Sequence, residues 1–148
     1  MPMLPDPAHM DIIDEACISA FEAEDAVGVF SLCENIMDDP KLPMHCPYHH
    51  YLIPAVLLTV AGKISGETAE MLQKRLKTAR ERAGTVPGGC CGQFGCCGAA
   101  VGAGIFACVW QGSTPLSKTG WAAGNEMTAR CLSAIASVEG PRCCKRVT

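Results

Sequence analysis

The apolar residues of this chain recur every three or four positions in nearly every segment, and this spacing constrains the fold more than any other feature. Residues 11–22, 25–37, 65–83 and 117–138 all show it. Such spacing places one apolar stripe along a helix, whereas a half-buried strand would alternate apolar and polar residues. No segment alternates convincingly. The chain is therefore predicted to be all-α, a compact single-domain bundle of about six helices.

Turn and capping residues indicate where these helices begin and end. The Asp39-Pro40 pair ends one helix, Ser65 is the expected N-cap of another, and Gly84 stops it. Proline is tolerated in a first turn, so the apolar run over residues 51–61 predicts a buried helix beginning near Pro47 or Pro54. The residues expected to face inward include Cys17, Phe30, Cys33, Leu72, Leu76, Ala79, Ala83, Trp121, Gly124, Thr128, Cys131, Ile135 and Val138.

Charge divides the chain unevenly. Residues 1–40 hold ten acids and no Lys or Arg, whereas residues 41–148 hold twelve Lys or Arg and five acids. Residues 1–148 are interpreted as one domain, with an acidic helical hairpin over 1–40 and a Cys/His-containing helical core over 41–148. The hairpin is expected to lie across the basic remainder, and the alternative is an acidic arm that recognises a basic partner.

The same features bear on partners and compartment. The basic run over residues 74–82 lacks interleaved aromatics, which predicts a solvated face and no nucleic-acid binding. The apolar stretch over 96–110 is shorter than the roughly 20 residues that span a bilayer, so no membrane association is expected. Without a visible secretory signal, an odd count of 11 cysteines argues against a secreted disulfide scaffold. A cytoplasmic location is expected.

Three adjacent cysteine pairs carry the chemistry, each beside glycine or proline: Cys90-Cys91, Cys96-Cys97 and Cys143-Cys144. The first two belong to a Gly/Cys-rich loop over residues 84–98. Thiolates bind soft or borderline metals, above all zinc and iron–sulfur clusters. Successive side chains diverge, so one cysteine of each pair is expected to be a ligand and the other to pack. A vicinal disulfide, or small side chains between crowded helices, are the other interpretations.

A histidine loop is the second candidate feature. Three of the four histidines lie within the segment Met44-His45-Cys46-Pro47-Tyr48-His49-His50, where His45 and His49 could converge on a metal. Surface imidazoles in a first helical turn would look the same in sequence. Cys91 and Cys97 are separated by five residues, close to the four-residue gap of some cluster-binding loops, and Cys143 and Cys144 could close the site. The predicted metal ligands are therefore Cys91, Cys97, one or both of Cys143 and Cys144, and His45 and His49. Basic residues around the last cysteine pair would favour its thiolate form.

Four segments together resemble an uncharacterised family of small helical proteins. They are the histidine loop, the glycine–cysteine segment over residues 88–104, the link Gly-Ser-Thr-Pro-Leu over 112–116 and the ending Gly-Pro-Arg-Cys-Cys-Lys-Arg over 140–146. The resemblance covers residues 40–148. It implies occurrence in anaerobic bacteria and methanogenic archaea, sometimes fused to a SAM-dependent methyltransferase domain. Its pattern matches Cys91, Cys97, Cys143, Cys144, His45, His49 and His50. Residues 95–102 are loosely similar to a redox-active family with a Cys-Gly-Cys-Ala-x-x-Gly signature, although the Cys-Gly-Cys order is absent here.

Together these patterns favour a metal-binding, cysteine-rich protein of redox, sulfur or methyl-transfer metabolism, with an iron–sulfur cluster favoured over zinc. The expected partner is a methyltransferase or redox protein. One alternative is a partner-docking module held by zinc or bare thiols. Another is an enzyme whose cysteine nucleophile is activated by His45 or His49. No acid–base pair, phosphate loop or dinucleotide fingerprint supports a defined reaction.

Overall fold

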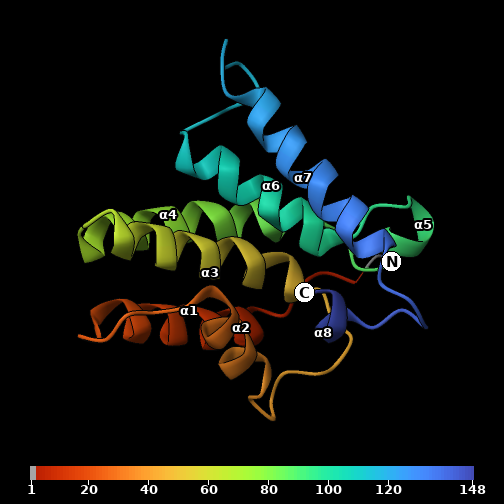
Figure 1. Ribbon diagram of the computed structural model, residues 1–148, viewed down its shortest axis with the longest axis horizontal. Helices are drawn as coiled ribbons and strands as arrows, with labels where there is room; N and C mark the ends of the chain where they lie inside the picture. Colours follow the sequence, from red (N-terminus) through yellow and green to blue (C-terminus); the bar gives the residue numbers. More distant parts are fainter. Residues whose placement is uncertain (1–2) are drawn as a thin grey trace.

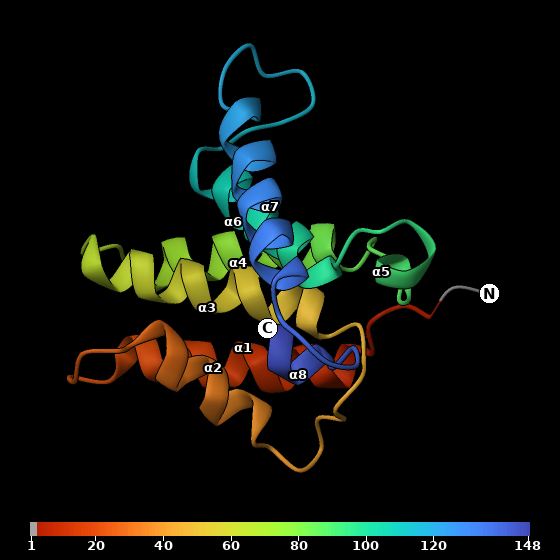
Figure 2. The same cartoon turned by 45° about the vertical axis from the view of Figure 1, so that its right-hand side comes forward.

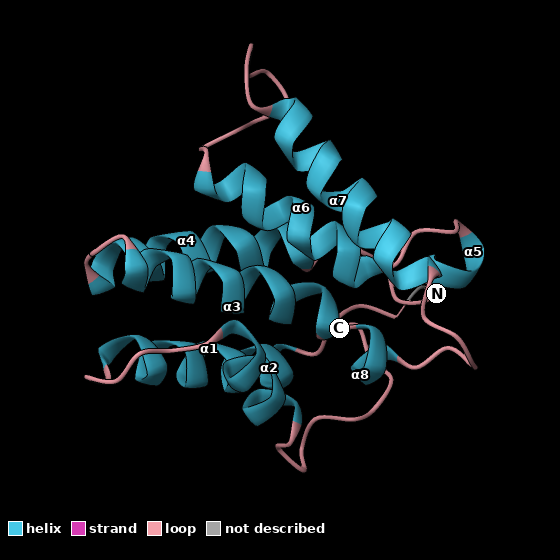
Figure 3. Ribbon diagram, viewed as in Figure 1, coloured by secondary structure: helices cyan, strands magenta, loops and turns pink. Residues whose placement is uncertain are grey.

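The computed structural model describes residues 3–148, and across that range it contains eight helices and no strand. Six helices have nine or more residues and two are single turns, which confirms the predicted all-α class and the expected number of main helices (Figure 3). In chain order the helices are α1 (Pro7–Glu22), α2 (Val29–Met37), α3 (His49–Ile64), α4 (Ala69–Ala83), α5 (Cys90–Gln93), α6 (Gly98–Trp110), α7 (Trp121–Ala136) and α8 (Cys144–Val147).

Helix α3 lies at the centre of the fold. It contacts α1 and α2 on one side, α4 beside it and α6 on the other side, while α7 packs mainly on α6. Figure 1 shows this stack of helix pairs, and Figure 2 shows α7 projecting at the top. Eleven of the 16 residues of α3 are buried, consistent with its apolar sequence.

The acidic hairpin packs on this centre through its apolar faces. Cys17 and Cys33 are buried in the core, as predicted. Burial raises the pKa of Cys17 to about 12 and that of Cys33 to about 11, so both stay protonated thiols. Phe30, expected to face inward, is 84% exposed, because the short helix α2 turns its Leu32, Cys33 and Ile36 toward the core instead.

Helix α3 begins at His49, close to Pro47, which was one of the two predicted starts, and the other proline, Pro54, lies inside the helix. Proline has no N–H, so the carbonyl of His50, four residues earlier, lacks its usual helical donor. Gly102 of α6 approaches at that point: a Cβ on Gly102 would lie 2.6 Å from the His50 oxygen. The proline and the glycine therefore let α6 approach α3 closely where the histidines sit.

Helix α4 begins later than expected. Its N-cap is Thr68, whose hydroxyl accepts the Met71 N–H at 3.2 Å, whereas Ser65 caps the end of α3. Gly84 caps the C-terminal end, as predicted. The predicted inward stripe is confirmed, since all four of its residues are buried: Leu72, Leu76, Ala79 and Ala83.

The basic run on α4 is only in part the solvated face that its composition predicted: Lys74 and Lys77 are exposed, whereas its three arginines are half-buried. Arg75 donates to the Val109 and Trp110 carbonyls at 3.0 and 3.1 Å and lies 4.5 Å from the Trp110 ring centre. Arg82 donates to the Ser113 carbonyl at 3.1 Å. These arginines join α4 to the C-terminal end of α6, where the helix dipole favours positive charge.

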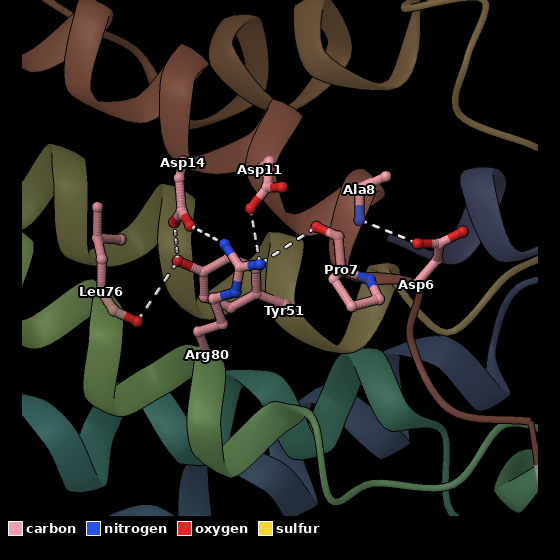
Figure 4. A network of polar contacts seen from close by, with 8 residues as sticks. All are labelled: Asp6, Pro7, Ala8, Asp11, Asp14, Tyr51, Leu76 and Arg80. Carbon is pink, nitrogen blue, oxygen red and sulfur yellow. Dashed lines mark hydrogen bonds and ion pairs between the residues drawn. The ribbon is translucent and has the colours of Figure 1, made fainter.

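Arg80 joins α4 to the acidic hairpin (Figure 4). Its guanidinium lies 2.7 Å from an Asp11 oxygen and 2.5 Å from an Asp14 oxygen, and the buried Tyr51 hydroxyl also donates to Asp14. Burial, with the neighbouring Asp14 charge, raises the pKa of Tyr51. The acidic α1 therefore meets a basic residue of the core, as the charge distribution predicts.

Helix α7 is the least buried of the long helices. It begins at Trp121 rather than near residue 117, and Gly124 is its only buried residue. Trp121, expected to face inward, is 65% exposed, and Val138 lies beyond the helix end at 40% exposed. The reason is that α7 packs chiefly against α6, so only a narrow stripe of its surface lies in a contact with another helix.

A membrane-crossing helix is not found in the part of the chain that the structure describes, because no helix there is both long and apolar enough.

Candidate metal centre

One end of the molecule gathers segments that are far apart in the sequence: the histidine loop, the turn around α5, the start of α6 and the C-terminal α8 (Figure 1). Between them lies a pocket of about 220 Å³, room for several water molecules. The pocket is lined by Met3, His45, Cys46, Pro47, His49, His50, Gly88, Gly89, Cys91, Cys97, Gly98, Ala99, Arg142, Cys144, Val147 and Thr148.

Each of the three cysteine pairs contributes one residue to this lining. Cys91, Cys97 and Cys144 line the pocket, whereas Cys90, Cys96 and Cys143 are absent from it. Cys90 instead packs at 5% exposure. The structure thus brings together five of the six predicted ligands, and Cys143, the N-cap of α8, is the one that it leaves outside the lining. This division follows the divergence expected of neighbouring side chains.

Glycine positions the first cysteine pair by its backbone freedom. Gly89 has a φ of +83°, a left-handed conformation that glycine adopts without steric cost, and it stands at the N-cap of α5. This backbone conformation directs the chain into α5, the short helix that carries Cys90 and Cys91. Cys97 stands at the N-cap of α6, directly before Gly98.

Arg142 lies among the three sulfurs. Its Nη1 donates to the Cys91 Sγ at 2.7 Å. That hydrogen bond and the nearby charges of Cys91, Cys144 and Cys97 raise the pKa of the guanidinium. No Asp or Glu is found among the lining residues, so the thiols are the groups that would supply negative charge. The Arg142 guanidinium is the cation placed beside these sulfurs.

The thiols differ in their electrostatic surroundings. Burial raises the pKa of Cys144, an effect opposed by Arg142 and by the Cys46 backbone N–H. Burial also raises the pKa of Cys90, with the charge of Cys91 adding to it. The Cys144 sulfur, which lines the pocket from α8, therefore has two neighbouring groups that lower its pKa, whereas burial raises it.

His45 is exposed at the pocket edge, and its Nδ1 accepts the Cys144 backbone N–H at 3.5 Å. His49 is only 2% exposed and stacks on Tyr48 with ring centres 4.0 Å apart. Burial lowers the pKa of His49 to about 4, and the Met44 backbone partly offsets this shift. Its Nδ1 lies 2.9 Å from the Thr148 hydroxyl, while its buried Nε2 has no hydrogen-bond partner in the described chain.

His50 was not among the ligands predicted from spacing, yet it lines the same pocket. Its Nδ1 lies 3.1 Å from the Val86 carbonyl, and burial lowers its pKa, so the ring is neutral. Arg142 was likewise predicted only as a charge beside the terminal cysteines. The sequence signal for His50 was its match to the family pattern, because nothing in helical spacing distinguishes it from His49.

The described residues contain no group of three or more His, Cys, Asp or Glu side chains close enough to hold a single metal ion. The donors thus share one pocket without surrounding a common point at single-ion distances.

Residues 13–148 match a family of unknown function, DUF5714. The chain belongs to this family. The match begins within α1, so the acidic hairpin is part of the DUF5714 unit, and the family extends further than the resemblance over residues 40–148 indicated. Searches of curated proteins and of solved structures found no match.

Proposed function

We propose that the protein binds a thiolate-ligated metal group at this pocket, through Cys91, Cys97 and Cys144. The observation that carries the proposal is the convergence of one sulfur from each cysteine pair on one cavity. These residues come from α5, the N-cap of α6 and α8, so the chain folds back over a long distance to bring Cys144 to the others. Three soft donors without a carboxylate favour zinc or iron–sulfur chemistry over hard cations.

An iron–sulfur cluster suits this pocket better than a single zinc ion. A tetrahedral zinc ion needs its donors within about 2.3 Å of one point, and no three side chains of the described residues are that closely grouped. A cluster several atoms wide holds its cysteines farther apart. Arg142, which donates to Cys91, would also supply the kind of hydrogen bond to sulfur that tunes a cluster's potential.

The test is anaerobic purification followed by iron, sulfide and zinc analysis and an absorption spectrum. We expect iron and acid-labile sulfide together with visible absorption. Cys→Ser variants at positions 91, 97 and 144 should each lose most of the iron. The matched variants at positions 90, 96 and 143, one from each pair, should keep it. Protein without iron or visible absorption would contradict the cluster, and equal losses across all six variants would contradict the assignment of ligands.

A thiol nucleophile is the second candidate function, because Arg142 Nη1 lies 2.7 Å from the Cys91 sulfur and nucleophilic cysteines sit in electropositive surroundings. In this version Arg142, rather than His45 or His49, activates the sulfur. Among the described residues, the one hydrogen bond between a cysteine sulfur and a histidine ring joins Cys46 to His9, with Sγ 3.6 Å from Nδ1. Rapid alkylation of Cys91 alone in metal-free protein, slowed at least tenfold in Arg142→Ala, would favour this function over metal binding.

We also propose a partner class. The motif resemblance supports a role in redox, sulfur or methyl-transfer metabolism of anaerobes, with a methyltransferase or redox protein as the partner. A centre of that kind should be reversibly reduced. Dithionite titration followed by absorption would test this, and a centre that is bleached without recovery on reoxidation would argue for a structural role instead.

A further inference from the structure

We infer that His50 supplies a nitrogen ligand to this metal group through its Nε2. The inference rests on the proposed function, because it adds a fourth donor to the three sulfurs. It selects one histidine from the three that line the pocket, and that histidine is neither of the two predicted from the spacing of the loop.

The position of the His50 ring is the first observation. A Cβ on Gly98 would lie 2.1 Å from both Nε2 and Cδ2 of His50. The distance to Cε1 is 2.6 Å, so Gly98 lies against the face of the ring, over its Nε2–Cδ2 bond, and leaves the in-plane electron pair of Nε2 uncovered. Gly98 follows Cys97, one of the proposed sulfur ligands, and all three residues line the pocket. Glycine is needed at this position because any side chain would displace the ring.

The tautomer of His50 is the second observation. The Val86 carbonyl lies 3.1 Å from Nδ1, and a carbonyl oxygen can only accept. Nδ1 therefore carries the hydrogen, and in the neutral ring Nε2 has a free electron pair. Metal-bound histidines commonly donate their other N–H to a backbone carbonyl in this way.

His45 has the opposite arrangement. Its Nδ1 accepts the N–H of Cys144, so in the neutral ring the proton sits on Nε2 and no electron pair remains free. His45 is also exposed, which leaves its ring without the packing that would orient it. It is the matched control, since it lines the same pocket with the same type of side chain.

His49 differs from His50 in how accessible its Nε2 atom is. Its Nε2 has essentially no accessible surface, so nothing of the size of a water molecule touches this nitrogen as the structure stands. The ring is held between the Tyr48 stack and the Thr148 hydroxyl. No described residue hydrogen-bonds the Nε2 of His50, and that atom is not among those fully buried without a partner. His50 is therefore the histidine whose electron pair is open to the pocket.

Pulsed EPR of the reduced, metal-loaded full-length protein tests the inference. The protein is prepared with natural-abundance histidine and with ¹⁵N-histidine. If zinc is bound instead of a cluster, Co²⁺-substituted protein gives the same readout. We expect a nitrogen coupling that changes with the label, persists in His45→Gln and His49→Gln, and is lost in His50→Gln. Gly98→Ala, which forces a methyl group against Nε2, should also remove or strongly weaken it.

The outcomes separate the two proposals. Protein without any bound metal would overturn the proposed function and this ligand with it. Metal-loaded protein without a label-dependent coupling, or a coupling that survives His50→Gln, would overturn the inference alone. If His50→Gln does not fold, retention of the coupling in the Gln variants at positions 9, 45 and 49 assigns it to His50 by elimination. Its loss in any of those three variants would overturn the assignment.

Discussion

Two buried tyrosines, one within the histidine loop and one just after it, differ in what their hydroxyl groups contribute to stability. Tyr48 and Tyr51 are both fully buried. The Tyr51 hydroxyl donates to Asp14, which also pairs with Arg80 (Figure 4). The Tyr48 hydroxyl has no hydrogen-bond partner. A buried polar group without a partner lowers stability, whereas one that bonds a carboxylate raises it.

Tyr51→Phe should therefore lower the free energy of unfolding by about 1–3 kcal/mol, because the Asp14 carboxylate loses a charged hydrogen bond. Tyr48→Phe, the matched control, should leave stability unchanged or raise it, because it removes a hydroxyl that bonds nothing. Urea unfolding of both metal-free variants at pH 7 measures the difference. A larger loss in Tyr48→Phe than in Tyr51→Phe would show that the two hydroxyls have been assigned the wrong roles.

At the scale of elements, the packing of α6 depends on its small residues. Small residues recur at every fourth position of α6, a spacing that lets another helix approach closely, and α6 is approached on two sides. Gly102 faces α3, and Gly104 faces α7, where a Cβ would lie 2.1 Å from the Thr128 hydroxyl oxygen and 3.0 Å from the Gly124 carbonyl. Each interior glycine lowers helix propensity by about 1 kcal/mol relative to alanine, and the packing offsets it.

Gly104→Ala should destabilise the protein by about 1–3 kcal/mol despite the gain in helix propensity, because the added methyl group forces α7 away. Gly92→Ala in α5 is the control: a Cβ there meets nothing within 4 Å, so stability should stay the same or rise. Chemical denaturation of both variants is the measurement. Equal stability of the two would show that the α6–α7 seam tolerates the methyl group.

Helix boundaries were less predictable than helix existence. The stripe on α4 was predicted residue by residue, because four regularly spaced apolar residues leave one face to bury. The start of α4 was not, since Ser65 and Thr68 are equally good N-caps in isolation and the end of α3 occupies Ser65. Trp121 and Phe30 were placed inward by periodicity, yet too few neighbours cover α7 and α2 to bury them.

At the scale of the whole molecule, the candidate site joins two segments of the chain that each hold only a short, single-turn helix. The turn around α5 and the C-terminal segment meet through Arg142 and Cys91, and α8 meets the histidine loop through Cys144 and His45. Thr148 adds a contact to His49. These contacts are polar and few, whereas the acidic hairpin is fastened by an apolar core. Binding at the pocket should therefore order one end of the molecule and leave the other unchanged.

Hydrogen–deuterium exchange with and without the bound metal group checks this expectation. Loading should slow exchange in residues 88–97 and 139–148 together, by about tenfold or more, because the same group would hold both segments. Helix α1 is the internal control and should keep its exchange rates. Protection confined to one of the two segments would contradict a centre shared between them.

The sequence by itself determined the helical class and the core faces of α1 and α4, because periodicity is a local property, and residue type made the cysteine pairs the candidate ligands. It also predicted that one cysteine of each pair would separate from its neighbour. Spacing and the family pattern had named Cys91 and Cys97, and only the tertiary structure distinguished Cys144 from Cys143: Cys91, Cys97 and Cys144 line the pocket because α5, α6 and α8 meet at one end of the fold. It also decided that Arg142 lies on Cys91 and that His50 opens toward the pocket, since long-range packing against Gly98 and Val86 orients that ring.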